Sequence, residues 1–137
     1  MADSLVIKSV HNGTRLELTG DIPRGREGYD GVTFTATLSG GPVSASVDVY
    51  DIRFHHWTEF FSELAANWRG WADVKTCESL EGHLLLSATS DRAGHVQLRV
   101  CLSSQQLEND WSAECPIHLE AGQLDALARS ASAYFGG

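Results

Sequence analysis

The chain has 137 residues and a formal net charge of −8, from 18 acidic and 10 basic side chains. This length suits one domain, so we expect residues 1–137 to fold around a single core. Apolar residues make up 42% and charged residues 20% of the sequence, which excludes a disordered or fibrous chain. The negative charge opposes phosphate binding, so nucleic acid is not an expected partner.

Membrane insertion and secretion are not expected either. No apolar run reaches the ~18 positions that a membrane-spanning helix needs, and the start of the chain lacks a basic segment followed by an apolar run. Cys77, Cys101 and Cys115 form no C-x-x-C pair, so we expect reduced, buried thiols and no disulfide framework. Eight of the ten basic residues are arginine, a bias typical of GC-rich bacterial genomes. We therefore expect a bacterial, cytoplasmic protein.

The first half of the chain has the pattern of four strands. Two β-prone runs, 5–10 and 15–19, flank Asn12-Gly13, a pair that predicts a hairpin with positive φ at both residues. Residues 20–31 are rich in glycine and charge, which predicts a mobile loop.

Two further strands and a helix follow. Apolar and polar residues alternate over 32–38 and over 43–50, which predicts an antiparallel pair with one buried face. Helical spacing then predicts an amphipathic helix that ends near Gly70. Its buried stripe is expected to contain Trp57, Phe60, Phe61, Leu64, Ala65 and Trp68.

The second half repeats this order. The predicted strands are 74–80, 83–90, 95–103 and 111–119, and a closing helix is predicted over 124–135. Pro116 cannot donate a backbone hydrogen bond, so we expect it on an edge strand or at a bulge. The fold class is therefore α+β, with an antiparallel sheet of seven to eight strands, in one sheet or two sub-sheets, and two amphipathic helices.

An offset of 63 or 64 residues superimposes the two halves. It places the alternating residues of 32–38 on those of 96–102, His55 on His118, and Phe61 and Leu64 on Leu124 and Leu127. Alternation alone produces matches of this kind, so internal duplication and chance both remain open.

The histidines and cysteines do not have the spacing of a metal site. His55 and His56 are adjacent and diverge on any regular element, and H-x-x-x-H and C-x-x-C are absent. His83 and His95 open two strands of one hairpin, which separates them by roughly 20 Å. We expect neither a metal nor another cofactor.

Catalytic motifs are also absent from the sequence. No G-x-S-x-G, S-x-x-K or phosphate-binding loop is present, and Cys77 and Cys101 fit buried, unreactive thiols better than nucleophiles. One alternative site gathers Asp48, Asp51 and His55 at the end of a strand, where a small-ligand binder or a hydrolase would use them.

Acidity is concentrated in the second half, where residues 58–137 contain 11 acids and 5 bases. Such a field steers a basic partner. The aromatics near element ends are expected to be exposed anchors. The predicted partner-binding residues are Trp71, Glu108, Asp110, Trp111 and Glu114.

Five short segments between residues 43 and 135 carry a resemblance: W-T-E-F-F at 57–61, W-R-G-W at 68–71, S-L-E-G at 79–82, G-H-V at 94–96, and G-Q-L at 122–124. Together they resemble a family of small bacterial proteins classed only as a domain of unknown function. The length, element order and W-x-x-F-x-x-x-L helix also resemble the WapI-type immunity proteins, which are small acidic cytoplasmic antidotes encoded beside polymorphic toxins. Neither resemblance supplies catalytic residues.

We expect a non-enzymatic interaction module, in the manner of an immunity or regulatory protein that binds a basic protein through an acidic surface. The ligand-binding or hydrolytic site at Asp48, Asp51 and His55 is the first alternative. The second is a structural subunit of a symmetric homodimer.

Overall fold

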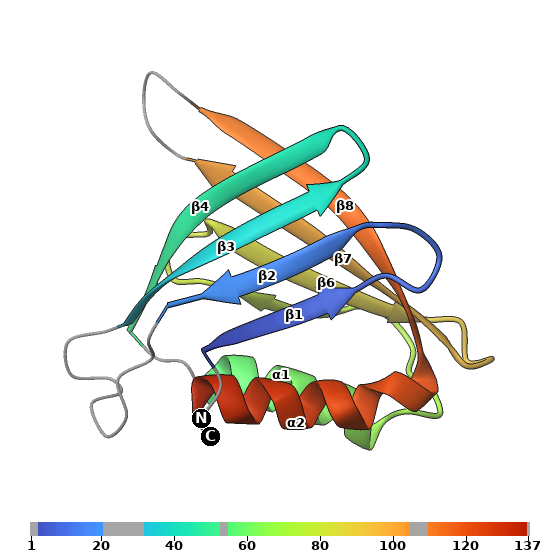
Figure 1. Ribbon diagram of the computed structural model, residues 1–137. Coiled ribbons are helices and arrows are strands. Elements are labelled where there is room, and N and C mark those ends of the chain that lie inside the picture. Colours follow the sequence, from blue (N-terminus) through green and yellow to red (C-terminus); the bar gives the residue numbers. More distant parts are fainter. Residues whose placement is uncertain (1–2, 21–31, 53–54, 105–109, 137) are drawn as a thin grey trace.

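The computed structural model describes residues 3–20, 32–52, 55–104 and 110–136 (Figure 1). Two α-helices and two four-stranded sheets, with strand orders β1-β2-β3-β4 and β5-β6-β7-β8, make up the described fold. The expected α+β class and the order strands-helix-strands-helix are confirmed. The elements are β1 (Ser4–Lys8), β2 (Arg15–Thr19), β3 (Val32–Gly40), β4 (Val43–Asp51), α1 (His55–Ala66), β5 (Lys75–Glu78), β6 (Leu84–Ser90), β7 (His95–Ser104), β8 (Trp111–Glu120), a short 3-10 turn (Ala121–Gln123) and α2 (Leu124–Phe135). Most of the predicted loop, residues 21–31, lies outside the described residues.

Each sheet is an antiparallel meander whose inner face is apolar. In β3, Phe34, Ala36 and Leu38 are buried, because alternate side chains of a strand share one face. The same alternation buries the inner residues of β6 and β7. Pro116 lies in β8, which is an edge strand, so its missing N–H leaves no ladder partner unsatisfied.

The β1–β2 hairpin has the expected position and a different turn. The pairing of β1 with β2 runs from Ser4 opposite Thr19 to Lys8 opposite Arg15. Neither Asn12 nor Gly13 in the turn has a positive φ. The Asn12 Oδ1 atom instead accepts a hydrogen bond from the Thr14 backbone N–H at 2.9 Å. This side-chain bond stabilises the loop, so the hairpin is confirmed but the expected positive φ at Asn12 and Gly13 was wrong.

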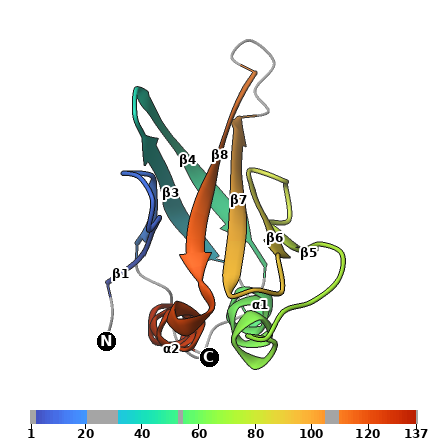
Figure 2. The same cartoon turned by 90° about the vertical axis from the view of Figure 1, so that its right-hand side faces the viewer.

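The two helices lie side by side beneath both sheets (Figure 2). Trp57 of α1, Phe34 of β3 and Phe135 of α2 form an aromatic cluster, with ring centroids 5.8–6.4 Å apart. All three side chains are buried. The cluster therefore joins the first sheet to both helices at the centre of one core.

The sheets also meet along one pair of edges, where residues just beyond β1 reach β8. The Val10 N–H donates to the His118 carbonyl oxygen at 2.8 Å, and the His118 N–H donates to the Ser9 hydroxyl at 3.0 Å. We call these two bonds the β1–β8 seam. They connect the first and last strands of the fold.

The two halves have the same order of elements, four strands and a helix. An offset of 63 or 64 superimposes β3 on β7, but α1 and α2 begin at residues 55 and 124, which are further apart than that. The same offset therefore does not superimpose the helices, because Phe61 lies inside α1 whereas Leu124 begins α2. The connection between β7 and β8 is longer than that between β3 and β4, which shifts the second helix along the chain.

Trp68 and Trp71 have the opposite burial to that expected from the sequence. Trp68 is 53% exposed and Trp71 only 8% exposed. Because α1 ends at Ala66, Trp68 lies beyond its buried stripe. Gly70, with φ +123°, then turns the chain, and the Trp71 indole N–H donates to the Ala88 carbonyl oxygen of β6 at 3.1 Å. An added Cβ at Gly70 would lie 2.9 Å from the Arg92 Cα, so this turn requires glycine.

Within the ranges that the structure describes, neither helix combines the length and the apolar composition needed to cross a membrane.

Truncation of Phe135 to alanine tests the aromatic cluster. The change removes a fully buried ring from contact with Phe34 and Trp57 and leaves a cavity. We expect the free energy of unfolding to fall by about 3–5 kcal/mol. Urea unfolding measures this, with Leu80→Ala as the control: Leu80 is 55% exposed, and its loss should change stability by no more than about 0.5 kcal/mol. Similar losses in both variants would contradict a central role for the cluster.

Candidate functional site

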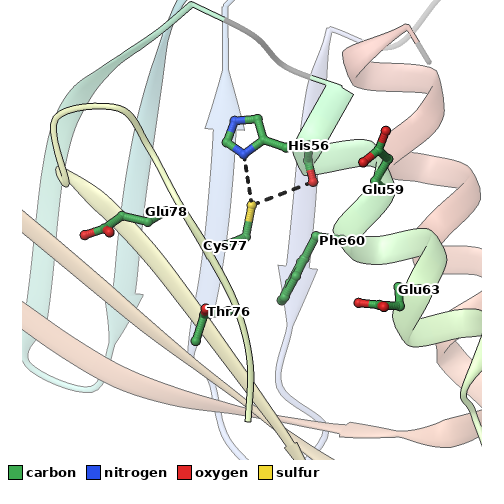
Figure 3. A pocket seen from close by; sticks show the side chains of 7 residues that line it. All are labelled: His56, Glu59, Phe60, Glu63, Thr76, Cys77 and Glu78. Carbon is green, nitrogen blue, oxygen red and sulfur yellow. Dashed lines mark hydrogen bonds between the residues drawn. The ribbon is translucent and has the colours of Figure 1, made fainter.

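The candidate site is a groove of about 450 Å³ between α1 and β5 (Figure 3). Its lining combines a thiol, an imidazole and a phenyl ring with three carboxylates. The lining residues are His56, Glu59, Phe60, Glu63, Thr76, Cys77 and Glu78.

Two contacts mark the ends of this groove. At one end the Cys77 Sγ lies 3.5 Å from the His56 Nδ1 atom. At the other end the Lys75 ammonium lies 3.6 Å from a Glu63 carboxylate oxygen. His56 and Glu63 are separated by two turns of α1, so the groove is about 10 Å long.

Asp51 supports the first of these ends from beneath. It is the last residue of β4, on the inward-facing side of the strand, and is only 4% exposed. Its Oδ2 atom accepts hydrogen bonds from the His56 Nε2 at 2.8 Å and from the Trp57 indole N–H at 3.2 Å. A carboxyl group so buried needs such donors, because losing water without them is costly.

The contact with Asp51 assigns a role to Nε2 of His56. A carboxylate only accepts hydrogen bonds, so Nε2 is the donor to Asp51, and a neutral ring with its hydrogen on Nε2 presents a lone pair at Nδ1. The Cys77 thiol can donate to that lone pair, and it also lies 3.7 Å from the His56 carbonyl oxygen. Carboxylate, imidazole and thiol thus form one chain of contacts, which we call the Asp51–His56–Cys77 chain.

The thiol is neutral in this arrangement. Burial raises the pKa of Cys77 from 9.0 to about 12, and the negative charge of Asp51 adds to the rise. Burial, followed by the charge of Glu114, also raises the pKa of Cys101. A free thiolate is therefore rare at neutral pH in the resting groove.

The structure separates the predicted group of Asp48, Asp51 and His55. Asp48 and Asp51 are three positions apart on one strand, so they face opposite sides of the sheet. Asp48 is exposed and accepts a bond from the Thr35 hydroxyl at 2.8 Å. His55 is exposed at the start of α1, and its neighbour His56 is the residue that bonds Asp51.

A signal for this site was present in the sequence. Asp51 continues the inward series of Ala45, Val47 and Val49, and a charged residue at an inward position requires partners. The expectation that Cys77 is buried was correct, but its contact with His56 was missed. That contact joins residues 21 positions apart on different halves of the fold.

The residues predicted to bind a partner have different environments. Trp71 is buried, so its expected exposure was wrong. Trp111 is 37% exposed and Asp110 is exposed. Glu114 accepts a hydrogen bond from Arg99 at 2.8 Å, while Glu108 lies outside the described residues.

Across the described ranges, no group of three or more histidine, cysteine, aspartate or glutamate side chains is arranged to hold a metal ion. The strand register places His83 and His95 at opposite ends of the β6–β7 hairpin, as the sequence indicated. His95 Nδ1 instead lies 2.6 Å from an Asp91 carboxylate oxygen. The hydrogen bond from the Ala93 N–H lowers the pKa of the Asp91 carboxyl group most, and the contact with His95 lowers it further.

The fold and groove define an α+β domain in which two meanders share one helical layer and an acidic groove opens between α1 and β5. The chain belongs to a family of unknown function, DUF6228, which matches residues 7–137. No curated protein and no solved structure matches the chain.

The Cys77 thiol should make stability depend on pH at the alkaline end. In the unfolded chain the thiol ionises near its ordinary pKa of 9.0, whereas in the folded chain it stays neutral to about 12. Ionisation therefore favours unfolding, and stability is lost as the pH rises from 9 to 12. Between about pH 8 and pH 10.5 the wild type should lose about 2 kcal/mol that Cys77→Ser keeps. Urea unfolding of both proteins at each pH measures the difference, and parallel pH profiles would contradict it.

Proposed function

We propose that the protein is an interaction module that binds a short basic segment of a partner protein in the groove between α1 and β5. The role is that of an immunity or regulatory protein in the bacterial cytoplasm, which blocks its partner sterically. The observation that carries the proposal is the rim of three carboxylates, Glu59, Glu63 and Glu78, around a concave surface.

Charge complementarity supports a cationic occupant. Within the described residues, Glu63 pairs with Lys75, and no ion pair involves Glu59 or Glu78. The groove also contains the side chain of Phe60, which is almost fully buried. Carboxylates beside such apolar surface attract a cation more strongly than carboxylates in open water.

Exposed apolar side chains support a protein as the source of that cation. Trp68, which follows α1, and Val74, which precedes β5, are each 53% exposed. They flank the two elements at the end marked by Glu63 and Lys75. A partner that lays a basic segment along the groove can cover both residues, and buried aromatic anchors provide much of the affinity of protein interfaces.

The groove is a better binding surface than the predicted acidic strand. On β8, Glu114 is already paired with Arg99, and the strand forms no part of the acidic groove. Asp110 and Trp111 are exposed at the start of that strand. The acidic side chains of β8 can repel unsuitable partners while the groove binds the basic one.

Neutralisation of the rim tests the proposal. The probe is a short peptide of alternating lysine and leucine, blocked at both ends, and binding is measured by calorimetry. The triple variant Glu59→Gln/Glu63→Gln/Glu78→Gln should weaken binding at least about tenfold, because it removes the carboxylates that face the cations. Wild-type binding should also weaken as salt is added, since the Debye length falls below about 10 Å.

The matched control removes the same number of charges elsewhere. Asp110→Asn/Glu114→Gln/Glu120→Gln neutralises three acids of β8 and its flank, so it changes the net charge equally. It should leave the affinity within about twofold of the wild type. If the β8 variant loses as much affinity as the groove variant, binding depends on overall charge and the groove proposal is wrong.

A further inference from the structure

The Asp51–His56–Cys77 chain opens on the groove, and binding a basic segment does not require it. We propose that Cys77 is a nucleophile that accepts an acyl group, with His56 as its base and Asp51 as the residue that positions the base. The substrate class is a carboxylic ester or thioester that carries a cationic group. The preference for a cation rests on the proposed binding function, whereas the nucleophile rests on its own geometry.

That geometry assigns one role to each residue. A nucleophile needs a base within hydrogen-bonding reach, and the base needs a third group that fixes its orientation. The Cys77 Sγ is 3.5 Å from Nδ1 of His56, and Asp51 holds Nε2 of the same ring at 2.8 Å. Cys77 and His56 both line the groove, while Asp51 lies buried behind the ring.

The high pKa of Cys77 is compatible with this role. That pKa describes loss of the proton to water, which would add a second negative charge beside Asp51. Transfer of the proton to His56 leaves the net charge of the chain unchanged, and the resulting imidazolium lies between the thiolate and the carboxylate. His56 therefore acts as a general base during the attack, and no free thiolate has to accumulate.

The acyl transfer proceeds in two balanced steps. The sulfur of Cys77 attacks the acyl carbon and forms a C–S bond while its proton passes to Nδ1 of His56; the leaving group departs with that proton. Water then attacks the thioester, His56 accepts a proton from the water and returns it to the departing sulfur. The products are the leaving alcohol or thiol, a carboxylic acid and the original Cys77 thiol.

The rim sets the charge of the substrate. Glu59 lies three positions after His56, which places it one turn along α1 on the same side of the helix. Both residues line the groove. If Glu59 binds the cationic group of a substrate, the acyl carbon of that substrate would therefore lie near the Cys77 sulfur.

The test compares two thiobenzyl esters, of Nα-acetyl-arginine and of Nα-acetyl-citrulline, which has nearly the same shape and no charge. Release of benzyl thiol gives the rate, and peptide mass spectrometry locates the acyl group. We expect it on Cys77 in preference to Cys101 and Cys115, which are both more exposed. His56→Gln should slow acylation at least about 100-fold. Equal acylation of the three cysteines, or an unchanged rate in His56→Gln, would overturn the proposal.

Asp51→Asn tests the positioning role separately. The asparagine amide can donate to Nε2, which moves the ring hydrogen to Nδ1 and removes the acceptor of the thiol hydrogen. We expect a slower reaction together with a changed tautomer of His56, which nitrogen-15 NMR of the imidazole reports. A slower reaction with an unchanged tautomer would reject Asp51 as the positioning residue.

The outcomes separate this inference from the proposed function. Acylation that favours the arginine ester, and loses that preference in Glu59→Gln/Glu63→Gln/Glu78→Gln, supports both. If the wild type binds the lysine peptide and no cysteine is acylated faster than in His56→Gln, the nucleophile is rejected and the binding function stands. Fast acylation of Cys77 without peptide binding or charge preference keeps the nucleophile and rejects the cationic substrate.

Discussion

The structure depends on one buried indole, that of Trp57. Its ring has no exposed surface and packs between Phe34 and Phe135, so the polar N–H must find an acceptor inside the protein. Asp51 provides the acceptor, and a buried carboxyl group in turn needs further donors. His56 satisfies that requirement and thereby brings its other nitrogen to Cys77. A packing constraint at the core thus determines the geometry at the surface.

The candidate site lies where the two halves of the fold meet. Asp51 and His56 belong to the first half, whereas Cys77 comes from the first strand of the second half. The groove therefore forms only when α1 docks against β5, and any movement between the halves changes the distance from the imidazole to the thiol. The proposed binding function and the proposed nucleophile share this location because the same interface supplies the acidic rim and the buried polar chain.

Most of the fold could be predicted from the sequence, and most of the site could not. Alternation over residues 32–38 and 95–103 identified strands because a sheet with one buried face imposes a period of two. The end of α1 was misjudged, since the helical spacing of Trp68 continues past the residue where the helix stops. The pairing of His56 with Cys77 depends on how two distant elements dock, and no local pattern encodes it.

The β1–β8 seam has a consequence for how the chain is made. The hydrogen bond between the His118 N–H and the Ser9 hydroxyl spans 109 positions, so it can form only after the chain as far as residue 118 has left the ribosome. Until then the segment that contains Val10 has no acceptor for its N–H in the last strand. During synthesis the nascent protein therefore presents an open strand edge, the kind of surface that other chains can join and that chaperones protect.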